Sequence, residues 1–95
     1  MNKQEQVVSL IEQGKFKEAI EFIDKSEDES LLIYKAISIL GLGKLEESLK
    51  FIEDNNKLLL KYEPSKTITL HVSIYIENED FVKAFEVINK YEELP

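Results

Sequence analysis

Apolar residues recur at intervals of three and four along most of this 95-residue chain, with polar residues between them. That spacing places the apolar side chains on one face of an α-helix. The clearest case is residues 31–52, where two such stretches flank a turn that contains Gly41 and Gly43. We expect the two glycines to end the first helix and Leu45 to begin the second.

Similar stretches lie on both sides of this central pair. Residues 2–13 are expected to form a helix that Gly14 ends. The next helix carries the apolar stripe Phe16, Ala19, Ile20 and Ile23. A sixth helix is expected to begin after Asp80, which caps it, and to end near Tyr91, with residues 92–95 frayed. Its apolar residues are Phe81, Ala84, Phe85 and Ile88.

The connection after the second helix carries a start signal for the third. Ser26, with Glu29 three residues later, matches a capping box, in which the two side chains bond reciprocally to backbone N–H groups. Asp28 or Ser30 could also be the cap. The sequence therefore predicts that a helix begins just after this acidic segment, without deciding which residue caps it.

The fourth helix and its successor are separated by weaker signals. Asn55 and Asn56 are poor helix formers, so residues 58–60 either continue the helix or begin a bent extension. Pro64 marks the next boundary, because proline disfavours helical angles in the residue before it.

Residues 67–76 give conflicting signals. Apolar residues alternate there with polar or aromatic ones, and half the segment is β-branched, which alone is typical of a strand. A lone strand would have no partner in this otherwise helical chain. We therefore expect a helix, whose buried residues would be Ile68, Val72, Tyr75 and Ile76. The fold class that follows is all-α.

Three segments of the chain are imperfect copies of one another. They begin at Gly14, Gly43 and Glu79, with spacings of 29 and then 36 residues. Each has a turn residue, then a large apolar residue two positions on, and a small residue three positions after that. The small residues are Ala19, Ser48 and Ala84. Small side chains let two helices approach closely, and repeats at this spacing are typical of helical arrays.

These copies resemble the second helix of the tetratricopeptide repeat family, in divergent form. The family pattern of a glycine, an aromatic residue and an acidic–alanine pair is matched at Gly14, Phe16, Glu18 and Ala19. Less closely it is matched at Gly43, Leu45, Glu47 and Ser48, and weakly at Asp80, Phe81 and Ala84. The resemblance implies one domain over residues 1–95, with units at about 1–27, 28–62 and 63–93. The implied fold is three antiparallel helical hairpins, about six helices, stacked as a short right-handed superhelix.

The resemblance also implies a function. In this family the first helices of the pairs line a concave groove that holds peptides or partner helices. The matching partner-binding residues here are Val8, Ile11, Ile33, Ile37, Leu40 and Ser73. The lysine and asparagine side chains that hold a peptide carboxylate in some members are absent from the matching sites. An apolar or amphipathic segment is therefore the expected ligand, although these residues could instead pack only in the core.

The C-terminal helix suggests a second function. Stacked repeats expose an apolar face at each end unless a polar helix covers it. Phe81, Phe85 and Ile88 would then be self-association residues, covered by a second copy, by a partner or by further residues of a longer chain. The alternatives to a peptide-binding module are accordingly a self-association domain, including a homodimer formed through this helix, and a peptide-sensing regulator.

Composition narrows the function classes further. The net charge of −7 and the scattered lysines disfavour nucleic acid and anionic membranes as partners. With no cysteine, thiolate metal sites and disulfides are excluded. The polar N-terminus does not resemble a signal peptide, so a cytoplasmic location is expected.

Candidate chemistry is sparse. The acidic runs lack the glycine and spaced ligands of a calcium loop, so no metal site is predicted. His71 is the lone histidine, and we expect it to be packed or half-buried. No phosphate loop, nucleophile motif or catalytic carboxylate pair is recognisable, so neither catalytic residues nor a cofactor are expected.

Overall fold

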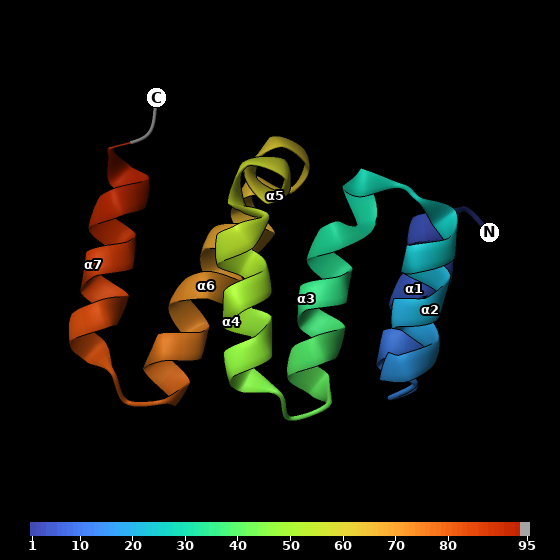
Figure 1. The fold of residues 1–95 in the computed structure, drawn as a ribbon, viewed down its shortest axis with the longest axis horizontal. Coiled ribbons are helices and arrows are strands. Elements are labelled where there is room, and N and C mark those ends of the chain that lie inside the picture. The colour runs from blue at the N-terminus through green and yellow to red at the C-terminus, as the bar shows by residue number, and fades with distance from the viewer. Residues whose placement is uncertain (94–95) are drawn as a thin grey trace.

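The computed structural model describes residues 1–93, in which every regular element is a helix and there is no strand (Figure 1). The elements are α1 (Lys3–Glu12), α2 (Phe16–Ser26), the 3₁₀ turn η1 (Glu29–Leu31), α3 (Leu32–Gly41), α4 (Leu45–Asp54), α5 (Asn56–Tyr62), α6 (Pro64–Glu77) and α7 (Phe81–Glu92). The Cα radius of gyration is 13.3 Å, which is typical of a compact chain of this length. The all-α prediction is confirmed. Residues 94–95 of the expected frayed end lie outside the described range.

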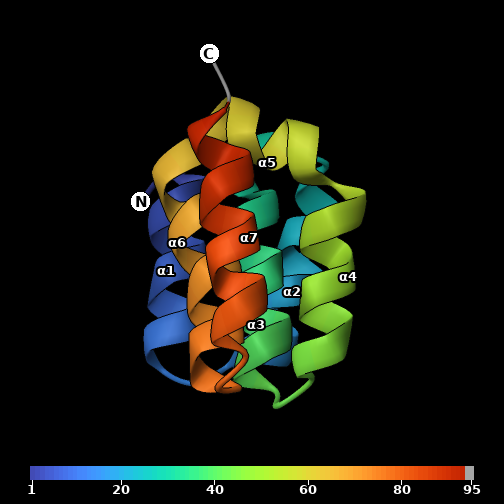
Figure 2. The ribbon, with the colours of Figure 1, turned by 90° about the vertical axis from the view of Figure 1, so that its left-hand side faces the viewer.

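The helices form two layers along the long axis of the molecule. Figure 2 looks along this axis and shows α1 and α6 on one side and α2 and α4 on the other. Helix α3 contacts both α1 and α6, and α7 packs against α6 at one end. The core between the layers consists of Val7, Ile23, Leu31, Ile33, Tyr34, Ala36, Ile52, Leu59 and Ile74.

The turn after α1 has a defined hydrogen-bond geometry. Gly14 adopts a φ of 74°, in the left-handed region. Its N–H donates to the carbonyl of Ile11 at 2.9 Å, and the N–H of Lys15 donates to Leu10 at 2.8 Å. This pair of bonds is the Schellman motif, which satisfies the free carbonyls at a helix end.

The turns after α3 and α6 repeat this geometry. Gly43 has a φ of 80° and Glu79 a φ of 58°. Each has the same two bonds: those of Gly43 to Leu40 and Lys44 to Ile39, and those of Glu79 to Ile76 and Asp80 to Tyr75. The predicted ends at Gly14 and Gly43 and the cap at Asp80, whose side chain accepts from Lys83 N–H, are confirmed. The third turn achieves the same shape with a non-glycine residue.

Gly41 has a role beyond ending the helix. Helix α3 ends at Gly41 as expected, but Gly41 is helical and its φ is not in the left-handed region, which Gly43 adopts instead. A Cβ atom at Gly41 would lie 2.5 Å from the ring of Phe16, closer than real Cβ atoms approach other carbon atoms. The missing side chain therefore makes room for Phe16 of α2 against α3.

Small residues mark the places where helices meet. Ala19, Ala36 and Ser48 are each 0% exposed, and Ala84 is 4% exposed. The Ser48 hydroxyl donates to the carbonyl of Ala36 at 2.8 Å, which joins α4 to α3. Because the serine is fully buried, this bond satisfies a polar group that would otherwise cost free energy.

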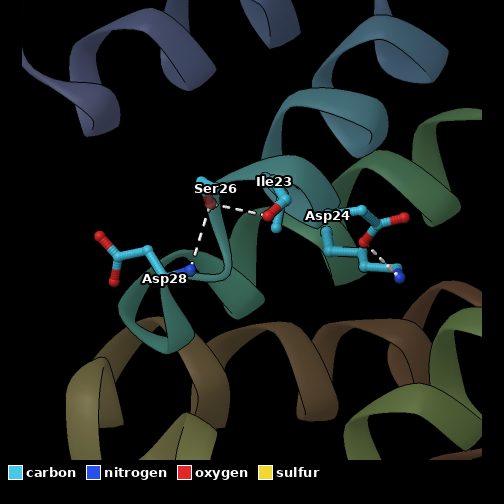
Figure 3. A network of polar contacts seen from close by, with 5 residues as sticks. Ile23, Asp24, Ser26 and Asp28 are labelled. Atoms are coloured by element: carbon cyan, nitrogen blue, oxygen red, sulfur yellow. Dashed lines mark hydrogen bonds and ion pairs between the residues drawn. The ribbon is translucent and has the colours of Figure 1, made fainter.

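The connection from α2 to η1 is held by short-range polar contacts (Figure 3). The Ser26 hydroxyl donates to the carbonyl of Ile23 at 2.7 Å and accepts from the N–H of Asp28 at 3.2 Å. The Asp28 carboxylate accepts from the N–H of Ser30 at 3.0 Å, so Asp28 is the cap among the three alternatives. Hydrogen bonds from Ser30 lower the pKa of Asp28 below its ordinary value.

The segment from α4 to α6 follows the boundaries expected from asparagine and proline. Asn55 separates α4 from α5, so residues 58–60 belong to a distinct short helix. Pro64 is the first residue of α6, where its missing N–H costs nothing. Helix α6 spans residues 67–76, which confirms the helical interpretation of that segment.

The predicted buried face of α6 is wrong. Its buried residues are Thr67, His71 and Ile74, whereas Ile76 is 48% exposed. The other residues expected to be buried, Ile68, Val72 and Tyr75, are only partly so. The reason is hydrogen bonding to other helices: the Thr67 hydroxyl donates to the carbonyl of Leu59 in α5 at 3.1 Å, and His71 is bonded to Tyr91 of α7. Satisfied polar groups occupy the inner face together with Ile74, and they turn Ile68 and Ile76 outward.

Gly41→Ala tests the close approach of α2 and α3. We expect it to lower the free energy of unfolding by about 1–3 kcal/mol, because the new methyl group overpacks the Phe16 ring. In a Phe16→Ala background the same change should be neutral or stabilising, since alanine favours a helix over glycine by up to about 1 kcal/mol. Urea unfolding of the four proteins measures the coupling. Equal effects in both backgrounds would contradict the proposed contact.

Glu79→Gly tests the backbone conformation of the third turn. We expect it to stabilise the protein by up to about 1 kcal/mol, because a left-handed residue with a Cβ atom costs roughly 1–2 kcal/mol and glycine does not pay this. Glu77→Gly is the matched control, since this residue lies within α6 and should lose about 1 kcal/mol. Thermal unfolding monitored by circular dichroism distinguishes the two.

Candidate functional site

An apolar hollow lies between α3 and α6 on one side of the molecule. It has a volume of about 410 Å³ and is lined by Ile37, Ser65, Lys66, Thr69, Leu70 and Ser73. We call it the α3–α6 hollow. Ile37 and Ser73, which come from different predicted units, are both in it, and the intervening wall is formed by Leu70.

The remaining predicted partner-binding residues lie elsewhere. Val8, Ile11 and Leu40 are half-buried and pack against the core. They do not line the α3–α6 hollow. Ile33 is 1% exposed and belongs to the core itself, so it has no surface to offer a partner. Ile33 lies in the first turn of α3, and its side chain packs in the core cluster.

Polar groups around the α3–α6 hollow are largely satisfied within α6. The Ser73 hydroxyl donates to the carbonyl of Leu70 at 3.0 Å. The ammonium of Lys66 lies 3.2 Å from the carboxylate of Glu63, and this hydrogen bond raises the pKa of the lysine. The accessible walls of the hollow are mainly apolar.

The predicted self-association residues lie on α7. Phe81 is 55% exposed and Phe85 is 66% exposed, while Ile88 is half-buried. Val82 on the same helix and Ile76 at the end of α6 are 70% and 48% exposed. We call the surface formed by Ile76, Phe81, Val82 and Phe85 the end face.

A polar network joins α5, α6 and α7 beneath this end of the molecule. His71 Nδ1 lies 2.7 Å from the hydroxyl of Tyr91, and the Asn56 amide donates to the same hydroxyl at 2.9 Å. The rings of His71 and Tyr91 meet edge to face with centroids 5.7 Å apart. His71 is 4% exposed, which confirms the expectation of a packed histidine.

The surroundings of His71 disfavour its charged form. Either neutral tautomer makes the contact with Tyr91: the tyrosine O–H donates to a bare Nδ1, or the tyrosine oxygen accepts from Nδ1–H, since a hydroxyl oxygen accepts two hydrogen bonds. Within the described residues Nε2 is buried without a partner. Burial lowers the pKa of His71 below its ordinary value, while Glu53 opposes this and Lys90 adds to it. Burial also raises the pKa of Tyr91.

Sequence reasoning missed this network for a physical reason. Asn56 and Tyr91 are 35 residues apart, and nothing local couples them. The available signal was that Thr67, His71 and Ile74 share one helical face.

Residues 1–93 contain neither a candidate metal site nor a candidate membrane span. No group of three or more histidine or acidic side chains is arranged to hold a metal ion. No helix in this range has the length and apolar character needed to cross a membrane.

Comparison of the chain with protein-family models, with curated proteins and with solved structures finds no match.

The pH dependence of stability tests the His71 network. The unfolded chain binds a proton at the ordinary histidine pKa of about 6.5, while the folded protein binds it only at lower pH. Stability is thus fully present above about pH 6.5 and is lost as pH falls from there through the lowered folded pKa. His71→Gln should flatten this dependence between about pH 7.5 and about pH 5.5. Urea unfolding measures it, and an equal loss of stability in both proteins would contradict the assignment.

Proposed function

We propose that this protein is a tetratricopeptide-like, non-catalytic interaction module whose α3–α6 hollow binds an apolar or amphipathic segment of a partner protein. The observation that carries the proposal is the hollow itself. It brings Ile37 and Ser73 together across two helices, and pockets of this size with apolar walls are the usual form of a ligand site.

The repeat organisation supports this proposal. The three turns at Gly14, Gly43 and Glu79 share the left-handed residue and the same pair of backbone bonds. The small residues that follow them, Ala19, Ser48 and Ala84, are all buried. Equivalent turns followed by equivalent contacts are what a chain of three helical hairpins requires, and we propose units at about 1–27, 28–62 and 63–93.

The arrangement of the first helices also agrees with the proposal. Helices α1 and α6 lie on the same side of the molecule, and α3 contacts both (Figure 2). In the proposed stack these three helices line the binding surface, while α2, α4 and α7 are the second helices of the pairs.

The charge of the chain indicates the chemistry of the bound segment. The net charge is −7, and Glu12 and Glu77 lie on the exposed sides of α1 and α6. A suitable segment would have an apolar stripe and flanking lysine or arginine residues. The apolar stripe would contact the hollow and hold the complex, and the basic residues would be attracted to the acidic protein and speed the encounter. Nucleic acid and anionic membranes carry the wrong charge for this surface.

Thr69→Arg tests the α3–α6 hollow. Thr69 is exposed and lines the hollow, so arginine should fill it and repel a basic ligand without disturbing the core. The probe is a synthetic helical peptide of leucine and lysine with leucines on one face. We expect at least about tenfold weaker binding by titration calorimetry.

The control for this test is Asn89→Arg, an equal change of charge on the exposed surface of α7. It should leave peptide affinity within about twofold. Amide chemical shifts should change on peptide addition at Ile37, Leu70 and Ser73. Equal weakening by both variants, or shifts confined to other helices, would contradict binding at the hollow.

A further inference from the structure

Exposed apolar side chains are concentrated at one end of the molecule. Apart from Met1 and Tyr62, the large hydrophobic residues that stand out as exposed in the described chain are the four of the end face, all within residues 76–85. Figure 2 views this end directly and shows α7 in front, with no helix over it, and α6 beside and behind it. Contiguous apolar surface of this kind marks an interaction site.

The helical register places both aromatic residues on the outer side of α7. On the opposite side of this helix, the ammonium of Lys83 lies 5.9 Å from the Tyr75 ring centroid. Lys83 and Lys90 line a polar hollow together with Glu53 of α4. Phe81, Phe85 and Ile88 form the stripe that faces away from these charges.

A depression lies on the outward side of α6, the helix against which α7 packs, and shares Thr69 and Ser73 with the α3–α6 hollow. It has a volume of about 350 Å³ and is lined by Ile68, Thr69, Val72, Ser73 and Ile76. We call it the end recess. Ile68, Val72 and Ile76 repeat every four residues and so form one outward row, which is the consequence of the buried polar face of α6.

We propose that the end face is the interface of a homodimer, in which the Phe85 ring of each copy inserts into the end recess of the other. A protruding aromatic side chain and a recess on the same surface are self-complementary. When both lie on one face, a two-fold axis satisfies both contacts at once and closes the assembly as a dimer.

The exposed area agrees with a second copy as the occupant. With about 200 Å² for each phenylalanine side chain, the open fractions of Phe81 and Phe85 amount to roughly 240 Å². Val82, Ile76 and the half-buried row of α6 enlarge this toward the apolar half of a standard interface, which buries about 800 Å² per partner. The area is thus that of a modest dimer.

The charge around the end face sets the conditions under which two copies associate. Exposed acidic residues border it, namely Glu77 beside Ile76, Glu86 beside Phe85, and Glu92 at the C-terminal end of α7. Two copies of net charge −7 therefore repel each other at low salt, and the apolar contact has to overcome this repulsion. The dimer is accordingly expected to be weak and to tighten as salt is added.

Sedimentation equilibrium on the whole chain, over protein concentrations up to about 500 µM, tests the proposal. The wild-type protein should fit a monomer–dimer equilibrium that tightens between about 0.05 M and about 0.5 M salt, because screening weakens the repulsion between acidic copies. Phe85→Asp should weaken the dimer at least about tenfold. Ile76→Lys, on the other helix, should weaken it as well.

Tyr62→Asp is the matched control, since it removes an exposed aromatic residue (39% exposed) from α5 and should leave the dimer unchanged. Circular dichroism verifies that each variant is folded, which the exposure of Phe85 and Ile76 leads us to expect. A wild-type monomer throughout the range would overturn the proposal and leave the face to a different partner. Growth beyond dimers, or equal weakening by Tyr62→Asp, would also overturn it.

Discussion

The close approach of neighbouring helices at small residues is the constraint on which this structure depends. Where α2, α3 and α4 meet, Ala19, Ala36 and Ser48 are fully buried. A glycine at position 41 leaves space for the ring of Phe16. Because interiors are packed as densely as organic crystals, a larger side chain at any of these sites would separate the layers. The turns at Gly14, Gly43 and Glu79 add to this constraint. Each reverses the chain over a few residues, so the helices on either side of the turn lie in contact.

Local signals were sufficient for most helix boundaries. Gly14, Gly43, Leu45 and Pro64 stand where the sequence predicts, because a turn residue or a proline acts through its own backbone angles. Tertiary contacts determined which face of α6 is buried. The inner face of α6 was chosen by hydrogen bonds from Thr67 and His71 to groups distant in sequence, which no measure of local hydrophobicity includes.

The candidate surfaces show the same division. Ile37 and Ser73 were predicted to share a groove from the repeat register, and they line one hollow. Ile33 was assigned to that groove but lies in the core, since a pattern gives the face of a helix and not how much of it neighbours cover. Phe85 was correctly expected to be uncovered, whereas the end recess follows from the rotation of α6 and could not be inferred from sequence.

The position of α7 has a consequence for how the protein opens. This helix packs chiefly against α6, and a hydrogen bond between Tyr91 and Asn56 links it to α5. Elements with few neighbours unfold locally at a fraction of the global free energy, and this can be seen in native-state amide hydrogen exchange. The α7 amides should therefore exchange through a partial opening that leaves α2, α3 and α4 intact. The helices would then unfold in steps of different free energy. The step with the lowest free energy would be the opening of α7, which bears the exposed aromatic residues.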